Sequence, residues 1–141
     1  MITAAEKDRR LRLYQAHTDA ENDHDLDAIM ATFADRAENS FNTTMFFGYQ
    51  EIANAHAGFG FSEFPGALEG LRSQTEAIYY TEDAIVAVVR LFGRFVRPLG
   101  VFPPTNRDVE LIGMSAYRFD AEDKLAHERV VMNFGPLVRA S

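Results

Sequence analysis

Three polar side chains on one face of a predicted N-terminal helix are the first candidates for chemistry. His17, Glu21 and His24 are spaced four and three residues apart. At about 100° per residue they fall on the same arc as Leu13 and Ala20. Polar groups that face an apolar interior cost free energy unless they are paired, and a functional role is one reason to keep them. We therefore predict that His17 and Glu21 are catalytic acid/base groups, with His24 a weaker candidate.

Two other interpretations of this helix remain open. His17 could be a core histidine bonded to a backbone carbonyl, and His24 could lie past the helix end and face solvent. Two histidines and one glutamate at this spacing could also bind a metal ion, but no motif supports such a site. The sequence has no cysteine, which excludes disulfides and thiolate ligands. We expect no metal and no cofactor.

A predicted strand near the C-terminus carries a third acid/base candidate. Strand alternation places Glu128, Val130 and Met132 on one face, and two of these three side chains are apolar. Glu128 is therefore predicted to be a catalytic acid or base in a cavity wall. Val130 and Met132 are predicted to contact the ligand. An ion pair between Glu128 and a nearby arginine, Arg118 or Arg90, is the alternative.

Several other side chains are placed where they could contact a ligand. Ser115 lies on the neighbouring predicted strand and could face the same interior as Glu128. His56 precedes an aromatic loop that could cover a flat apolar ligand or only pack on a helix. Tyr14 and Tyr80 could donate a hydrogen bond to a carbonyl oxygen.

The elements that would position these residues follow an α+β order. Thr3 and Glu6 form a capping box ahead of the first helix. We predict helices over 4–22, 25–33 and 49–57, strands over 40–47, 71–80, 84–96, 109–119 and 125–132, and a last helical turn within 134–140. A strongly bent, mostly antiparallel sheet wrapped over the N-terminal helices would make a cone with an apolar interior.

Composition limits the classes of function. The chain has 141 residues, which is the size of one domain spanning 1–141. Its net charge of −7 argues against a nucleic-acid partner. No apolar run reaches the length of a membrane span, and the first residues lack a secretory pattern, so we expect a cytoplasmic protein. Twelve Phe and five Tyr could fill a core or line a cavity.

The last third of the chain resembles a known family. A Gly/Pro/Thr/Arg loop over 100–107 leads into a strand that ends in Tyr-Arg-Phe. An acidic turn over 120–123 and a strand that begins Lys-Leu follow it. This order is similar to that of the SnoaL-like polyketide cyclases, a branch of the nuclear transport factor 2-like (cystatin-like) superfamily. The resemblance implies the cone-shaped fold and a homodimer, and it places Asn42 near a polar pocket position.

The same resemblance shows where this chain departs from its relatives. When the last strands are matched from Lys124, the catalytic Asp of the cyclases falls on Val130. The terminal Asp of a second branch falls on Asn133, which cannot act as a base. The sequence therefore predicts a cofactor-independent enzyme that performs acid/base chemistry on an apolar carbonyl or polyaromatic small molecule in a closed pocket. The alternative is a non-catalytic module of the same fold that binds a small molecule or mediates dimerisation.

Overall fold

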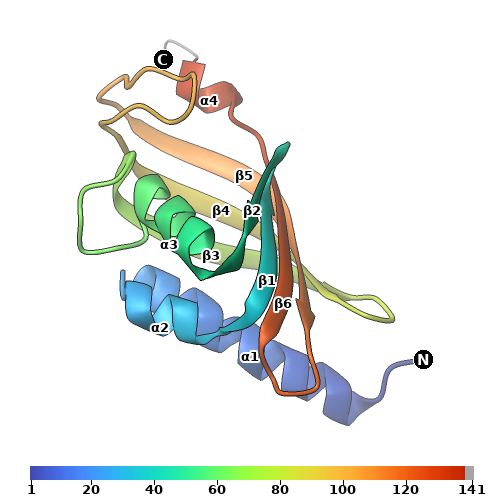
Figure 1. The fold of residues 1–141 in the computed structure, drawn as a ribbon. Helices are drawn as coiled ribbons and strands as arrows, with labels where there is room; N and C mark the ends of the chain where they lie inside the picture. The colour runs from blue at the N-terminus through green and yellow to red at the C-terminus, as the bar shows by residue number, and fades with distance from the viewer. Residues whose placement is uncertain (139–141) are drawn as a thin grey trace.

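A curled six-stranded sheet with helices on its concave side forms the structure, a computed structural model that describes residues 1–138. The strand order is β2-β1-β6-β5-β4-β3. Figure 1 shows α1, α2 and α3 on one side of the sheet. The elements are α1 Ala4–Asn22, α2 Leu26–Ala31, β1 Phe33–Phe41, β2 Thr44–Phe47, α3 Gly48–Phe59, β3 Leu68–Tyr80, β4 Ile85–Phe95, β5 Asp108–Phe119, β6 Leu125–Met132 and α4 Gly135–Val138.

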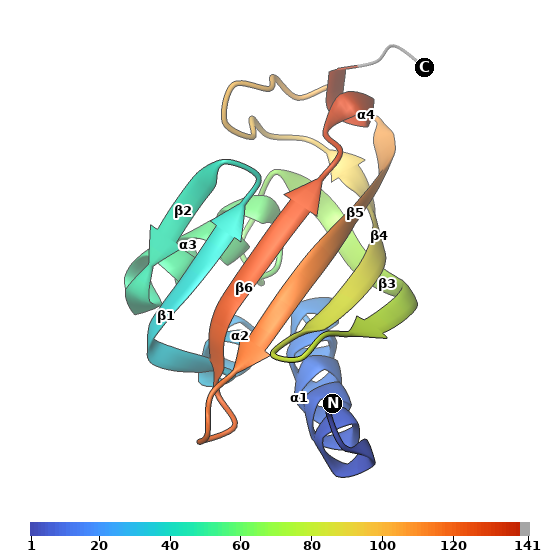
Figure 2. The ribbon, with the colours of Figure 1, turned by 90° about the vertical axis from the view of Figure 1, so that its right-hand side faces the viewer.

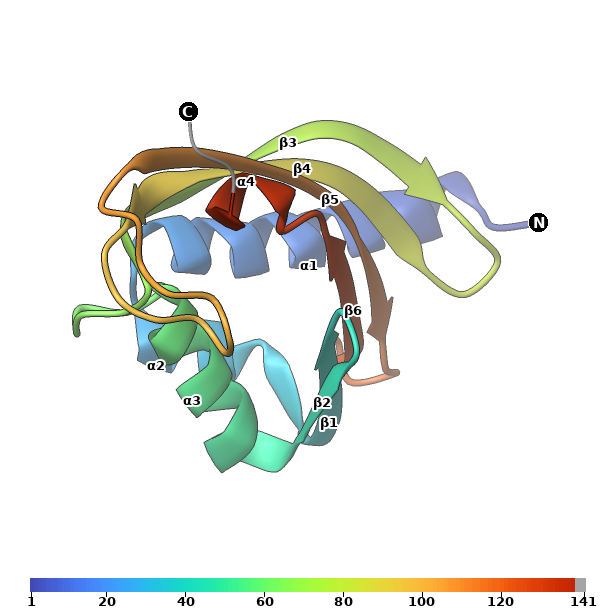
Figure 3. The ribbon, with the colours of Figure 1, turned by 90° about the horizontal axis from the view of Figure 1, so that it is seen from above.

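The sheet is antiparallel except for one pair of strands. β1 and β6 run parallel, and every other neighbouring pair is antiparallel. Seen from above in Figure 3, the sheet curls around α1 and α3 without closing. This confirms the predicted fold class, a strongly bent and mostly antiparallel sheet around N-terminal helices.

Helix α1 is fixed to the sheet by its own polar residues. Thr3 caps the helix by accepting a hydrogen bond from the Glu6 backbone N–H, which is one half of the predicted capping box, and the Glu6 carboxylate accepts from Arg9 and Arg10. The buried guanidinium of Arg10 donates to the backbone carbonyls of Thr81, Glu82 and Ala84 at the turn between β3 and β4. These bonds fix the position of α1, whose inward face carries His17 and Glu21.

The main difference from the predicted elements lies in the first strands. The helix predicted over 25–33 ends at Ala31, and a nine-residue strand, β1, begins at Phe33. The strand predicted over 40–47 is instead the end of β1 and all of β2, separated by a turn in which Asn42 has a φ of 53°. β1 was missed because its polar residues hide the strand pattern, and its pairing with β6 decides the conformation.

The remaining elements differ from the predictions by a few residues at their ends. α3 spans Gly48–Phe59 rather than 49–57, and β3 begins at Leu68 rather than at residue 71. The predicted last helical turn is observed as α4, and residues 139 and 140 of that prediction lie outside the described residues. Among residues 1–138, no helix is both long enough and apolar enough to cross a membrane.

Candidate functional site

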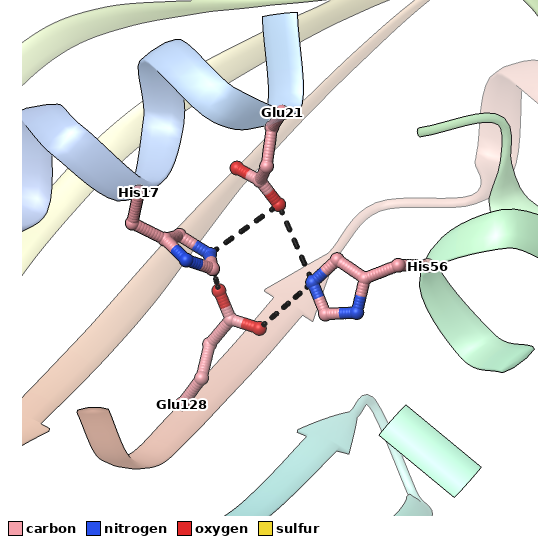
Figure 4. Close-up of side chains that lie close together, drawn as sticks. All are labelled: His17, Glu21, His56 and Glu128. Carbon is pink, nitrogen blue, oxygen red and sulfur yellow. Dashed lines mark hydrogen bonds and ion pairs between the residues drawn. The ribbon is translucent and has the colours of Figure 1, made fainter. Parts of the chain in front are cut away.

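Four buried side chains from three parts of the fold meet inside the curled sheet. His17 and Glu21 come from α1, His56 from α3 and Glu128 from β6 (Figure 4). His17 Nε2 lies 3.0 Å from one carboxylate oxygen of Glu128 and 3.5 Å from Glu21 Oε2. His56 Nε2 lies 3.5 Å from Glu21 Oε2 and 3.6 Å from the other oxygen of Glu128. We call these four residues the His–Glu quartet.

The other nitrogen of each imidazole is held outside the quartet. Nδ1 of His17 lies 2.8 Å from the Thr32 hydroxyl, which itself donates to the Ile29 carbonyl. Because that hydroxyl has used its proton, it must accept from His17 Nδ1–H. Nδ1 of His56 lies 2.8 Å from the Ile52 carbonyl, which can only accept. Both rings therefore turn Nε2 toward the two carboxylates.

A parallel strand pair positions the carboxylate of Glu128. Asn39 on β1 lies opposite Glu128 in the register of β1 with β6. Its side-chain amide donates to Glu128 Oε1 over 2.6 Å. Glu128 is 3 % exposed, and among the described residues it forms no ion pair with Arg118 or Arg90, the alternative from the sequence, since its partners are His17 and His56 and Arg90 bonds Glu76 and Glu110. Asn39 was missed because β1 was not predicted.

Burial and charge act in opposite directions on the protons of the quartet. Burial alone would lower the pKa of His17, but the charges of Glu21 and Glu128 raise that pKa to about 10. The pKa of His56 is also raised, since contacts with the same two carboxylates outweigh its burial. Burial would raise the pKa of Glu21, yet His17 and His56 lower it to about 2. The contacts within the quartet therefore favour the charged forms of His17, His56 and Glu21.

A small cavity reaches one side of the quartet. Its volume is about 50 Å³, enough for a few water molecules. Glu21, His56 and Glu128 line it, whereas His17 is fully buried behind them. The rest of the wall is mostly apolar and includes Ser115, Val130 and Met132, three of the predicted ligand contacts, together with Asn39, Phe41, Ala55, Phe59, Phe61, Ser73, Val89, Leu91 and Tyr117.

A larger groove lies beyond this cavity. It has a volume of about 730 Å³ and is lined by the β1–β2 hairpin, one face of α3, loop residues 98–102 and Phe134. Phe41, Ala55 and Phe59 line both spaces. The rings of Phe41 and Phe59 have centroids 4.9 Å apart, so this pair separates the inner cavity from the groove.

The structure places the other predicted site residues outside the quartet. Tyr14 is buried next to it but bonds Thr75 and does not line the cavity. Asn42 lines the outer groove, where its side chain accepts from a β6 backbone N–H. Tyr80 stands at the far end of β3 under Lys7. His24 lies past the end of α1, and its Nε2 donates to the Leu71 carbonyl.

His56 has a larger place in the site than the sequence indicated. It was predicted only as a ligand contact beside the aromatic loop, and the structure adds it to the quartet. Phe61 of that loop is buried and lies against His56, with ring centroids 6.3 Å apart. The signal that could have found this role is the helical spacing of Ile52, His56 and Phe59, which puts His56 on the buried face of α3.

Solved structures share this fold at low sequence identity. A protein assigned as a SnoaL-like polyketide cyclase from Jannaschia sp. CCS1 superposes with a TM-score of 0.78 at 14 % identity, covering 94 % of each chain. A Mycobacterium tuberculosis protein in complex with estradiol-17beta-hemisuccinate gives 0.70 at 16 % identity, covering 91 % of this chain and 96 % of that one. An NTF2-like protein from Burkholderia thailandensis E264 gives 0.69 at 21 %, covering 86 % and 88 %.

The family assignment comes from the sequence. No curated protein matches the chain in a sequence search. The family model described as "SnoaL-like domain" matches residues 14–128, which is most of the chain and includes all four members of the quartet. The chain therefore belongs to the SnoaL-like domain family.

Proposed function

We propose that this protein is a polyketide cyclase-like enzyme that performs acid/base chemistry on an apolar carbonyl or polyaromatic small molecule without a cofactor. The observation that carries the proposal is the His–Glu quartet, which presents charged groups to the inner end of a mostly apolar cavity. Charged groups in such a place can move a proton while bulk water is kept out.

The geometry favours different roles for the four side chains. Glu128 and Glu21 both line the cavity, and Glu128 is the base in this scheme that takes a proton from a carbon next to the substrate carbonyl, because a pKa of about 2 makes Glu21 a poor proton acceptor. His56 also lines the cavity and, as an imidazolium, can donate to the oxygen on which negative charge develops. His17 is a positioning residue in this scheme, because it reaches the cavity only through Glu128 and Glu21.

The two spaces suggest how a substrate would bind. The inner cavity is far smaller than the roughly 300–1,000 Å³ of small-molecule sites, whereas the outer groove falls within that range. An apolar body would occupy the groove while its reacting carbonyl end passes between Phe41 and Phe59. The steroid ester bound by the Mycobacterium tuberculosis relative supports an apolar ligand of this kind.

Exchange of α-protons with deuterium, followed by NMR on a panel of aromatic ketones, tests the proposal. Glu128→Gln and His56→Gln are expected to lose exchange, and His17→Gln is expected to slow it. His127→Gln is the matched control, because His127 neighbours Glu128 on β6 but lies outside the quartet. Ligand affinity is measured separately. Unchanged exchange in Glu128→Gln and His56→Gln would contradict the proposal.

A non-catalytic binding module of the same fold is the second candidate. The observation that favours it is the small volume of the inner cavity together with Val130 and Asn133, where the resemblance places Asp. Binding of an apolar ligand in the groove with no exchange in any ligand tested would favour this function.

The convex face of the sheet supports a homodimer. Figure 2 shows this face, which no helix within residues 1–138 covers. Met114 on β5 and Val131 on β6 are opposite each other in register, and both are exposed, as are Tyr79 and Ile112. We expect Met114→Glu to convert a dimer to a monomer in light scattering, with Glu122→Gln as the control in an exposed turn.

A cytoplasmic location likewise stays a prediction from the sequence.

A further inference from the structure

We propose that the His–Glu quartet is also a binding site for one divalent cation of the zinc class, held by four protein ligands. The inference goes beyond the proposed function, because a cation can bind here whether or not the protein converts a substrate. It also revises the expectation from the sequence, which considered a metal only at His17, Glu21 and His24 and expected none.

The first argument is the spacing of the ligand atoms. One ligand atom from each of the four residues lies within 4.8 Å of the other three. In a tetrahedral site with metal–ligand bonds of about 2.0–2.1 Å, neighbouring ligand atoms are about 3.3–3.4 Å apart. The four histidine–carboxylate distances are 3.0, 3.5, 3.5 and 3.6 Å, with His17 and His56 facing different oxygens of Glu128. These distances are close to the tetrahedral spacing, and a cation at the centre would draw one ligand atom from each residue together from separations of no more than 4.8 Å.

The second argument is the set of hydrogen bonds around the quartet. Metal-bound histidines usually donate their other ring N–H to a fixed oxygen, and metal-bound carboxylates are hydrogen-bonded in turn. Here His17 donates to Thr32 and His56 donates to the Ile52 carbonyl, so each Nε2 points toward the centre. Asn39 donates to Glu128. Three of the four ligands are therefore already oriented by outer contacts.

The third argument is the kind of ligand and the charge. Imidazole nitrogens suit zinc and its d-block neighbours, whereas magnesium and calcium prefer oxygen ligands alone. A bound cation would displace the proton from each Nε2, and two neutral imidazoles with two carboxylates then compensate the charge of one divalent cation, so a loaded site would be neutral. That balance matters because all four side chains are buried, and a net charge there would be costly.

Four protein ligands would leave no open position on the cation. Such closed sites are typical of structural zinc, whereas catalytic zinc keeps a position for water. The cation would also occupy the Nε2 and carboxylate atoms that acid/base chemistry needs. We therefore expect bound metal to stabilise the fold and to stop proton exchange. The expected inhibition rests on the proposed function, but the binding does not.

Cobalt titration of the full chain, without a polyhistidine tag and after removal of metals with a chelator, tests this site. We expect one Co²⁺ per chain, with the visible spectrum of a four-coordinate ion. At free Zn²⁺ about 100 times the Kd, Tm should rise by roughly 6–10 °C. Glu21→Gln and His56→Gln should lose the site, and Asn39→Ala should weaken it by roughly 10–100-fold. His127→Gln should bind like the wild type.

Three outcomes would overturn the inference. They are no Co²⁺ bound by folded wild-type protein, a spectrum of hydrated Co²⁺ only, or equal binding in folded Glu21→Gln. The wild-type titration decides the question even if a variant fails to fold. If metal does not bind but ketone exchange occurs, only this inference fails. If metal binds but the metal-free protein catalyses no exchange of ketone α-protons, the proposed function fails instead.

Discussion

The ion pair between His17 and Glu128 can be tested with a double-mutant cycle. Each residue is replaced by glutamine, singly and together, in protein kept free of metal by a chelator. Glutamine keeps most of the volume of each side chain and removes its charge. Both residues are almost inaccessible, at 0 % and 3 % exposure, so solvent can replace little of the lost interaction.

The structure gives the size of the expected effect. At the observed 3.0 Å, two unit charges attract by about 5–6 kcal/mol at an effective dielectric constant of about 20. Desolvation opposes this attraction, and removing one member of a buried pair usually costs about 3–5 kcal/mol. Glu21 remains 3.5 Å from His17 when Glu128 is neutralised, so we expect the lower end of that range for Glu128→Gln. The double variant should lose less than the sum of the single losses, with a coupling of about 2–3 kcal/mol.

The free energy of unfolding is measured by urea denaturation at pH 6, below the raised pKa of His17. Equal m-values in the four proteins would show that the unfolding reactions are comparable. A cycle between His127 and Glu128 is the control, because these neighbours on β6 are not paired, and its coupling should be near zero. A coupling below about 0.5 kcal/mol for His17 and Glu128 would refute the ion pair and, with it, the positioning role given to His17.

Further predictions concern the surroundings and the protons of the quartet. Asn39→Ala should lower the free energy of unfolding by about 1–3 kcal/mol, because Glu128 loses a buried donor, as urea denaturation would show. In metal-free protein, stability should fall as the pH rises from 6.5 to about 10, the raised pKa of His17, and this fall should be smaller in His17→Gln, where only His56 keeps a raised pKa. The contribution of Glu21 should be lost as the pH falls from 4.5 toward 2, as acid unfolding would show. Gly113→Ala should lower Tm in thermal unfolding, because the added methyl group would meet the backbone and a side-chain sulfur of β6.

The sequence predicted the parts of the site that lie on regular elements. Helical spacing put His17 and Glu21 on one face of α1, and strand alternation put Glu128 on the face that also carries Val130 and Met132. The structure shows that these two faces meet. His24 could not be placed in the same way, because α1 ends at Asn22 and His24 takes a φ of 55°.

The parts that were not predicted depend on contacts between distant residues. Asn39 reaches Glu128 only because β1 pairs with β6 in parallel, a contact across 89 residues that no local pattern encodes. His56 joins the quartet only because α3 packs inside the curl of the sheet. The small inner volume likewise depends on how the aromatic rings pack, which the count of Phe and Tyr does not reveal.

Val130 occupies the position where the resemblance places an Asp, and the position of Glu128 on the same strand helps to explain this difference. Both residues lie on the same face of β6, and both line the inner cavity. Moving a carboxylate two residues along a strand displaces it by about 6.6 Å without turning it away from the interior. At position 128 the carboxylate pairs with His17 and His56. The apolar side chain of Val130 cannot form an ion pair with either histidine. A buried carboxylate without a partner would cost free energy. The placement of the carboxylate at Glu128 therefore depends on the two histidines that pair with it. We therefore expect that Val130→Asp, introduced together with Glu128→Gln, would not restore the wild-type exchange of ketone α-protons.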